Sequence, residues 1–517
     1  MIPETIFSSL NPSHYTWQQS PQDPSLWQRR ALSNECMWLP RPKDLHELFI
    51  CTSIALNSPI PRPTLDSAAA RAWQILRFQV PELALTAHAS CSKDGAGAGD
   101  RAVYMQYRPP QSQVEVDAWI DWTSHFECGR DVQEFKGLRA KVLLMKRGHD
   151  SDKTFLLLRA QNQNESNDFV KNVQIMLYVD HQVTDGTGIK IVLGKYLSIL
   201  ASALNNPPEI LQDEIKWEES YKNLSPPWIQ HMNEDQVTSG PEYNEMAARN
   251  RDNILEKLKT NPGLPLSQTS NPATQETHFI TLSLTQTSAI LQAIKKVLGP
   301  SSNITHLCHA AIVLALLRAS PLSASTSGLA TQTLSSPCWL NGRRYLNPTP
   351  TCPSPSTDYI PICLSFAPII FTDTDELVLS STATRDEIRE KLLRACRIST
   401  EQYMYIRGRR SMLPETVNLF EDIGRMMFLA NSNKQKEQSI TEPSSQNNGK
   451  IQEPSQTAEP FFLSDGLTEQ YISHTYPSSP SQTPPILTVQ TVHFAAHAEQ
   501  NLFVPSPLLS NTSHSLV

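Results

Sequence analysis

The sequence lacks the features that would place the protein in a membrane, in a secretory route or on nucleic acid. Its start, "MIPETIFSSLNPSHYTWQQ", has no basic segment followed by an apolar core, so we expect no signal peptide. The most apolar run, "HAAIVLALLRA", is too short to cross a bilayer, so we expect no membrane partner. The net charge is −7 and no basic block is present, so we expect no nucleic-acid partner.

The cysteine pattern lacks a disulfide framework. Nine cysteines are scattered along 517 residues, and none forms a C-x-x-C pair. An odd number of scattered cysteines is typical of reduced, buried thiols in an intracellular protein. We therefore expect a cytoplasmic location.

Several catalytic and cofactor motifs are missing as well. Glycine is scarce, with 18 residues against 39 prolines, and "GAGAG" (95–99) lacks the full G-x-G-x-x-G and its flanking strand and helix. No G-x-S-x-G is present, which argues against a serine hydrolase of the α/β-hydrolase type. His306, Cys308 and His309 stand at the start of an apolar helix without a second ligand cluster, which favours packing over metal binding. We expect no metal and no tightly bound cofactor.

What the chain does contain is typical of a globular protein of mixed α/β class with two halves. Hydrophobic residues make up 39% and charged residues 18%, and 517 residues exceed what one core usually organises. Apolar periodicity predicts helices at 64–80, 187–204, 284–299, 303–320 and 384–407. It predicts strands at 101–109, 114–122, 140–148, 154–161, 173–180, 276–284, 359–371 (broken at Pro368) and 484–498.

A polar, proline-containing section separates the two predicted halves. We expect a first half over 1–205, a crossover linker over 206–276 and a second half over 277–517. Residues 431–459 are poor in apolar residues and rich in Gln, Ser, Asn, Lys and Glu, so we expect a disordered insert there.

The candidate site lies in "YVDHQVTDGTG", where a nearly continuous apolar strand ends and a helix begins. His181 follows the strand, and Asp185 and Gly186 follow His181 at a spacing of four and five. A strand end is a place where a rigid scaffold often carries catalytic side chains. The alternative is a polar strand-to-helix turn in which Asp185 only caps the helix. The residues alone leave both interpretations open.

This motif resembles the H-x-x-x-D-G signature of the chloramphenicol acetyltransferase-like superfamily, which includes condensation domains and BAHD acyltransferases. "LNGRRYL", with Asn341 and Arg343, resembles the N-x-R element of the second half. The stretches "WQRRALSNE", "AAARAWQILRFQVPELAL" and "THLCHAAIVLALL" are similar to the fungal trichothecene 15-O-acetyltransferase-like family. The resemblance covers most of the chain, about 15–500.

The resemblance implies two similar α/β sandwich halves that enclose a central tunnel, a design that permits a monomer, and the activity of an acyl-CoA-dependent O-acyltransferase. Acyl-CoA, acetyl-CoA in this family, would be the co-substrate, and a small-molecule alcohol of fungal secondary metabolism the acceptor. His181 would act as general base, which suits imidazole because its pKa lies near the working pH. Asp185 would pair with Arg343 and orient the motif, Asn341 would support that pair, and Gly186 would permit close backbone approach.

The sequence also departs from relatives in this superfamily. The D-F-G-W-G element of the plant branch is absent, and Asp180 stands where condensation domains have the first His of their motif. Two alternatives to an acyl-CoA-dependent O-acyltransferase stay open. One is a degenerate, non-catalytic binding relative, and the other is a free-standing condensation-type enzyme that forms an amide or ester from a carrier-bound thioester.

Overall fold

The fold is known from a computed structural model. It describes residues 12–32, 35, 46–89, 103–149, 151–161, 168–205, 215–253, 263–265, 277–320, 333–420, 457–458, 462–464, 466–477 and 485–498. The "GAGAG" segment, residues 431–456 of the expected insert and the tail after residue 498 lie outside the described residues.

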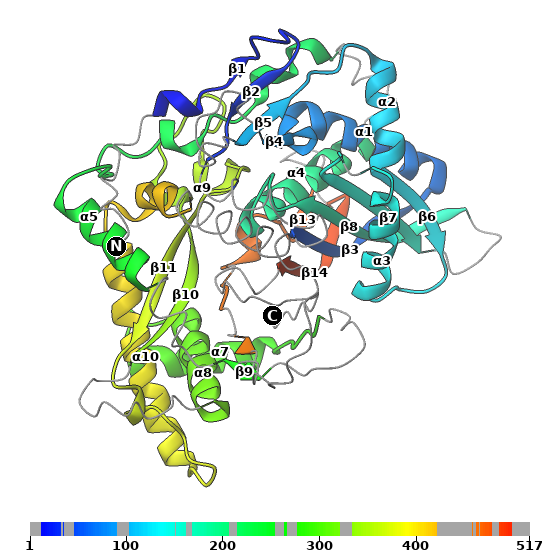
Figure 1. Ribbon diagram of the computed structural model, residues 1–517. Helices are drawn as coiled ribbons and strands as arrows, with labels where there is room; N and C mark the ends of the chain where they lie inside the picture. Colours follow the sequence, from blue (N-terminus) through cyan, green and yellow to red (C-terminus); the bar gives the residue numbers. More distant parts are fainter. Residues whose placement is uncertain are drawn as a thin grey trace, which may run out of the picture.

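The largest sheet has six strands in the order β13-β14-β3-β8-β7-β6 (Figure 1). Its pairs are antiparallel except β6 with β7, which run parallel. The strands are β3 (His46–Pro61), β6 (Ser124–Gly129), β7 (Thr154–Gln161), β8 (Phe169–Asp180), β13 (Thr475–Tyr476) and β14 (Leu487–Ala498).

Both faces of this sheet are covered, because alternate side chains of its central strands enter different cores. Leu48, Ile50, Ile175 and Leu177 belong to the core that lies under helices α1 (Arg62–Gln79) and α4 (Gly186–Asn205). The side chains at the alternating positions point to the other face of the sheet, toward helix α3 (Phe135–Lys146). They are Phe49, Cys51, Phe155, Leu157, Met176 and Tyr178. The buried strand β8 therefore ends in a rigid position, directly before His181.

Helix α4 is long and apolar enough to cross a membrane by length and composition alone. However, 72% of its apolar window is buried inside the protein, where Ile189, Leu193 and Leu197 pack into the core. This helix is a core element, and its first turn carries the end of the candidate motif.

Within the second half, the described elements from α7 to α10 are organised around an antiparallel pair of strands, β10 (Leu334–Asn341) and β11 (Leu364–Phe371). Helices α8 (Ile304–Ala319) and α10 (Arg385–Arg407) share its core, which includes Leu314, Phe371 and Tyr403. Helix α7 (Leu284–Leu298) lies beside α8. The remaining labelled α-helices and strands are β1 (Gln18–Gln19), β2 (Trp27–Arg30), β4 (Thr86–Ala89), β5 (Val103–Tyr107), α2 (Gln113–Thr123), α5 (Pro241–Asp252), β9 (Leu264–Pro265), α9 (Pro355–Asp358) and β12 (Thr457–Ala458).

Strand β14, late in the sequence, lies in the large sheet beside the early strand β3. It pairs with β3 from Leu487 opposite Leu56 to Ala498 opposite His46 (Figure 1). The predicted strand at 484–498 is thus confirmed, but it lies in the same sheet as the strand that leads to His181.

Two predicted strands are wrong, because they are helices. Residues 114–122 belong to α2, where Val116, Trp119 and Thr123 are buried at helical spacing and the Ser112 hydroxyl caps the first turn. Residues 140–148 fall mainly in α3, where Leu138 and Val142 are buried. Short apolar runs fit the periodicity of a strand as well as that of a helix, and in these two segments tertiary packing selects the helix.

Two further expectations about the second half need correction. Residues 277–283 form no strand, and Ile280 is 91% exposed, because no described strand pairs with this segment. Pro368 does not break its strand, since it lies opposite Pro337 in a two-stranded sheet where both strands are edges. The other predicted helices, at 64–80, 187–204, 284–299, 303–320 and 384–407, are confirmed within a few residues.

Candidate active site

His181 lies in the turn between β8 and α4, and the residue is partly exposed although its ring Nδ1 is buried. The turn is closed by a hydrogen bond from the Val183 N–H to the Asp180 carbonyl, at 2.9 Å. Burial lowers the pKa of the His181 imidazole below its ordinary value, and the Asp185 and Asp180 carboxylates act in the opposite direction. The net lowering keeps the ring neutral at neutral pH, which is the state that a general base requires.

Asp185 caps helix α4 and is fully buried. Its Oδ1 accepts hydrogen bonds from the N–H groups of Thr187 and Gly188, at 3.0 and 2.9 Å. These are N–H groups of the first helical turn, which have no partner within the helix. The capping interpretation of the motif is therefore correct as far as it goes.

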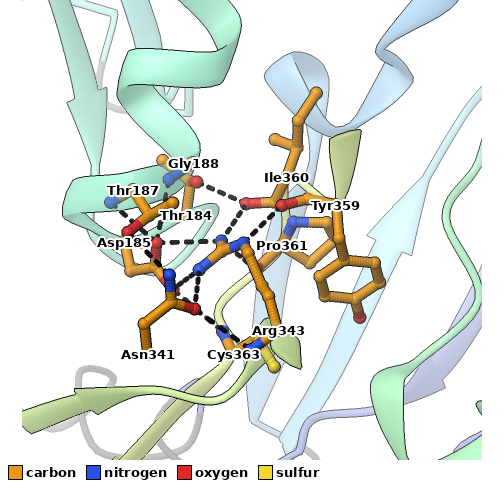
Figure 2. Close-up of polar contacts among 10 residues, drawn as sticks. All are labelled: Thr184, Asp185, Thr187, Gly188, Asn341, Arg343, Tyr359, Ile360, Pro361 and Cys363. Carbon is orange, nitrogen blue, oxygen red and sulfur yellow. Dashed lines mark hydrogen bonds and ion pairs between the residues drawn. The ribbon is translucent and has the colours of Figure 1, made fainter. Parts of the chain in front are cut away.

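The same carboxylate also forms a two-pronged ion pair with Arg343 of the other half (Figure 2). Nη1 of Arg343 donates to Asp185 Oδ2 and Nη2 lies beside Oδ1, both at 2.9 Å, and the two side chains have no exposed surface. The pairing that the family resemblance implied is present, and it joins residues separated by 158 positions. Desolvation is the largest single effect and opposes the charge on Arg343, but the charge of Asp185, its hydrogen bond and the neighbouring Cys363 and Tyr359 together raise the pKa of the guanidinium.

Further hydrogen bonds satisfy the donors and acceptors of this pair. Arg343 Nε donates to the Tyr359 carbonyl at 2.6 Å, and Nη2 donates to the Pro361 carbonyl at 3.0 Å. The Cys363 N–H donates to Asp185 Oδ2 at 2.9 Å. A buried ion pair is tolerated only when such bonds replace the lost water, and here residues 359–363 supply them. We call the Asp185–Arg343 ion pair together with these hydrogen-bond partners the buried joint.

Asn341 holds the arginine from the end of β10. Its Oδ1 accepts the backbone N–H of Arg343 at 3.0 Å, and its Nδ2 lies 3.5 Å from Thr187 Oγ1 on α4 (Figure 2). The supporting position predicted for Asn341 therefore agrees with the geometry.

The tightest backbone approach in the motif is at Gly188. A Cβ on this residue would overlap the Thr184 Oγ1 and the Ile360 carbonyl oxygen. Thr184 Oγ1 itself donates to that carbonyl at 2.5 Å. Gly186 is the first residue of α4, and its role beside a reacting carbonyl stays a prediction.

The sequence reasoning missed the segment 359–363, which contributes three carbonyls and one N–H to the joint. "YIPIC" looked like the start of a strand, whereas β11 begins only at Leu364. The available signal was Pro361, which lacks an N–H and keeps its neighbours out of a ladder.

His306 and His309 belong to the core of the second half. The ring nitrogens of His309 contact Tyr403 Oη at 3.0 Å and Ser336 Oγ at 2.8 Å, and Nδ1 of His306 contacts Thr400 Oγ1 at 3.0 Å. Within the described residues, no group of three His, Cys, Asp or Glu side chains is arranged to hold a metal ion.

Comparisons with known proteins identify relatives of this chain. The family model described as "15-O-acetyltransferase Tri3" matches residues 7–418. The Stachybotrys chartarum protein SAT12 is 28% identical over 353 residues, which are 65% of this chain and 59% of the relative. The trichothecene O-acetyltransferase TRI3 of Trichoderma arundinaceum is 23% identical over 368 residues, 65% of each chain. Both alignments span less than two thirds of the relative's length.

A solved structure shares the fold. It is the TRI3 trichothecene 15-O-acetyltransferase from Fusarium sporotrichioides, with a TM-score of 0.75 and 20% identity, over 96% of this chain and 90% of that chain. The expected mixed α/β fold is therefore confirmed.

Replacing Arg343 tests the buried joint. We expect Arg343→Met to lower the free energy of unfolding by about 3–5 kcal/mol, because the Asp185 charge stays buried without its cation. Arg344→Met is the matched control, since Arg344 is exposed and makes no carboxylate pair among the described residues. We expect it to change stability by at most about 0.5 kcal/mol. Denaturant unfolding measures both, and equal effects of the two substitutions would contradict the assignment.

Adding one methyl group tests the close approach at Gly188. We expect Gly188→Ala to destabilise the protein by about 1–3 kcal/mol, because Cβ forces the Ile360 backbone away from α4. The same change at Gly137 in α3, where only ordinary contact with the Gln133 side chain results, should be neutral or slightly stabilising. Thermal unfolding of the two variants gives the comparison, and a neutral Gly188→Ala would show that the joint is loose.

Proposed function

Because the chain belongs to the family described as 15-O-acetyltransferase Tri3, we propose that it transfers an acetyl group from acetyl-CoA to a hydroxyl group of a small molecule. The acceptor that we propose is a fungal secondary metabolite, a trichothecene-type terpenoid alcohol, since the relatives from Trichoderma arundinaceum and Fusarium sporotrichioides are named trichothecene acetyltransferases. Acetyl-CoA would be a co-substrate that is consumed in each turnover, with no tightly bound cofactor.

In this proposal, His181 is the general base. Its neutral imidazole accepts the proton of the acceptor hydroxyl while the oxygen attacks the thioester carbonyl. The tetrahedral intermediate then collapses, the C–S bond breaks, and the imidazolium returns the proton to the leaving CoA thiolate. The products are an acetyl ester and CoA, and the histidine ends the cycle in its neutral form.

The observation that supports this proposal most is the Asp185–Arg343 joint. Asp185 is engaged by the first turn of α4, by Arg343 and by the Cys363 N–H, so its carboxylate is not available as a base. His181, four residues before it, is the neighbouring titratable group with a lowered pKa and partial exposure. Asp185 therefore orients the motif, and His181 is left to handle the proton.

Removing the imidazole is the direct test. We expect His181→Ala to lower kcat for acetyl transfer by about 10²–10⁴-fold, while the affinity for CoA measured by calorimetry stays near that of wild type. His149→Ala is the matched control, since that histidine stacks on Trp122 outside the site. Equal transfer rates of His181→Ala and wild type would refute the assignment of the base.

The pH dependence gives a second test of the same role. A protonated imidazole cannot act as a general base. We therefore expect kcat/KM to fall as the pH is lowered, with the shape expected for protonation of a single group. Because burial lowers the pKa of His181, the midpoint should lie below the ordinary histidine value of 6.5. Initial rates at saturating acetyl-CoA over a range of pH measure it. A midpoint above 6.5 would contradict the proposed environment of the base.

The same assays separate the two rival functions. Transfer from a carrier-bound thioester, with none from acyl-CoA, would identify a condensation-type enzyme. Absence of CoA binding, together with no thiol release for any trichothecene alcohol, would identify a non-catalytic binding relative.

A further inference from the structure

Asp180 is a buried carboxylate immediately before the H-x-x-x-D-G motif. It is the last residue of β8, and only 4% of its surface is exposed. Its Oδ1 accepts the backbone N–H of Gln182 at 2.9 Å, so its side chain closes a turn over His181. Oδ2 pairs with Lys153 Nζ at 3.4 Å.

Asp180 and Lys153 are held together through their backbones as well. The Asp180 N–H donates to the Lys153 carbonyl at 2.7 Å, immediately before β7 begins. The side-chain pair is partly shielded, since 6% of the Asp180 side chain and 17% of the Lys153 side chain are exposed. The carboxylate therefore has a fixed place at the carboxyl end of β8, an inner strand of the sheet.

The turn that carries His181 is thus clamped at both ends by the same kind of contact. On one side Asp180 accepts a backbone N–H of the turn and pairs with Lys153. On the other side Asp185 accepts backbone N–H groups of α4 and pairs with Arg343. Each clamp is a carboxylate that bonds to the local backbone and to a cation from another element.

We propose that Asp180 is a positioning residue for His181: its carboxylate, anchored by Lys153, fixes the backbone of the turn that presents the imidazole. The inference rests on the proposed function, in which that imidazole is the general base. A displacement of about 1 Å in a reacting group is enough to reduce a rate about 10²-fold, so a loose turn would reduce kcat rather than substrate affinity.

The charge of Asp180 should also affect the pKa of His181, and the charges around the turn determine in which direction. Glu47 lies opposite Asp180 on β3, and it pairs with Arg139 at 3.0 Å and Lys146 at 3.8 Å, both from α3. In the described part of the chain, the two carboxylates that act on His181, Asp180 and Asp185, are paired with Lys153 and Arg343. Because the Asp180 charge stabilises the imidazolium, neutralising it should lower the pKa of His181 further.

Three substitutions separate position from charge. Asp180→Ala removes both the acceptor for the Gln182 N–H and the charge. Asp180→Asn keeps an oxygen that can accept this N–H but removes the charge. Lys153→Met leaves the carboxylate and removes its anchor. Glu127→Gln is the matched control, since Glu127 on β6 of the same sheet pairs with Lys141 and Arg159, away from the turn.

Steady-state kinetics is the first measurement. We expect Asp180→Ala to lower kcat about 10–100-fold with KM for both substrates within about 2-fold of wild type. Asp180→Asn should keep kcat within about 3-fold and move the acid limb of kcat/KM to lower pH. Lys153→Met should fall between them, and Glu127→Gln should match wild type. A folded Asp180→Ala variant with wild-type kcat, or with raised KM and unchanged kcat, would overturn the proposal.

The second measurement needs no substrate. Diethyl pyrocarbonate modifies the neutral form of an imidazole and not its protonated form. The rate at which His181 itself is modified, located by mass spectrometry and followed against pH, therefore reports the pKa of His181. We expect a lower midpoint in Asp180→Asn than in wild type. An unchanged midpoint would overturn the charge effect. If wild type transfers no acetyl group but this midpoint shifts, the proposed function fails while the coupling of Asp180 to His181 stands.

Discussion

The structure depends on one buried ion pair that bridges the two halves of the chain. Asp185 and Arg343 have no exposed side-chain surface, and taking such charges out of water costs several kcal/mol each. Two direct contacts of 2.9 Å and a shell of backbone groups offset that cost. Because the geometry that satisfies these bonds is narrow, the pair specifies how the start of α4 meets the segment before β11.

The ion pair also bears on the proposed catalysis, because the Asp185 carboxylate holds the turn that carries His181 as well as Arg343. Asp185 ends the turn that begins at the last residue of β8, so the ion pair fixes one end of the backbone that carries His181. Gly188 lets α4 approach the Ile360 carbonyl without a side chain in between. The far end of the chain contributes independently, since β14 lies beside β3 and thereby supports the strands on which this turn is mounted. The proton transfer that we propose for His181 would require such rigidity, because a base is effective only within hydrogen-bonding reach of its substrate.

Much of this site could be predicted from local patterns and a family resemblance. The strand before His181, the helix after Gly186 and the partnership of Asp185 with Arg343 all agree with the structure. The errors came from short apolar runs. Residues 114–122 and 140–148 suit either a strand or a helix, and only packing against the sheet selects the helix. Residues 277–283 have strand-like composition but lie without a partner strand among the described residues.

The sequence by itself determined that a strand ends at the motif and that a helix begins within it, because the apolar pattern of each element is strong and the motif lies between them. Only the tertiary structure decided the rest of the joint. The carbonyls of 359–361 and the Cys363 N–H are backbone groups, and backbone groups leave no mark on residue identity. The pairing of Asp180 with Lys153 likewise arises from sheet register, because the alignment of β7 with β8 brings these two distant residues together.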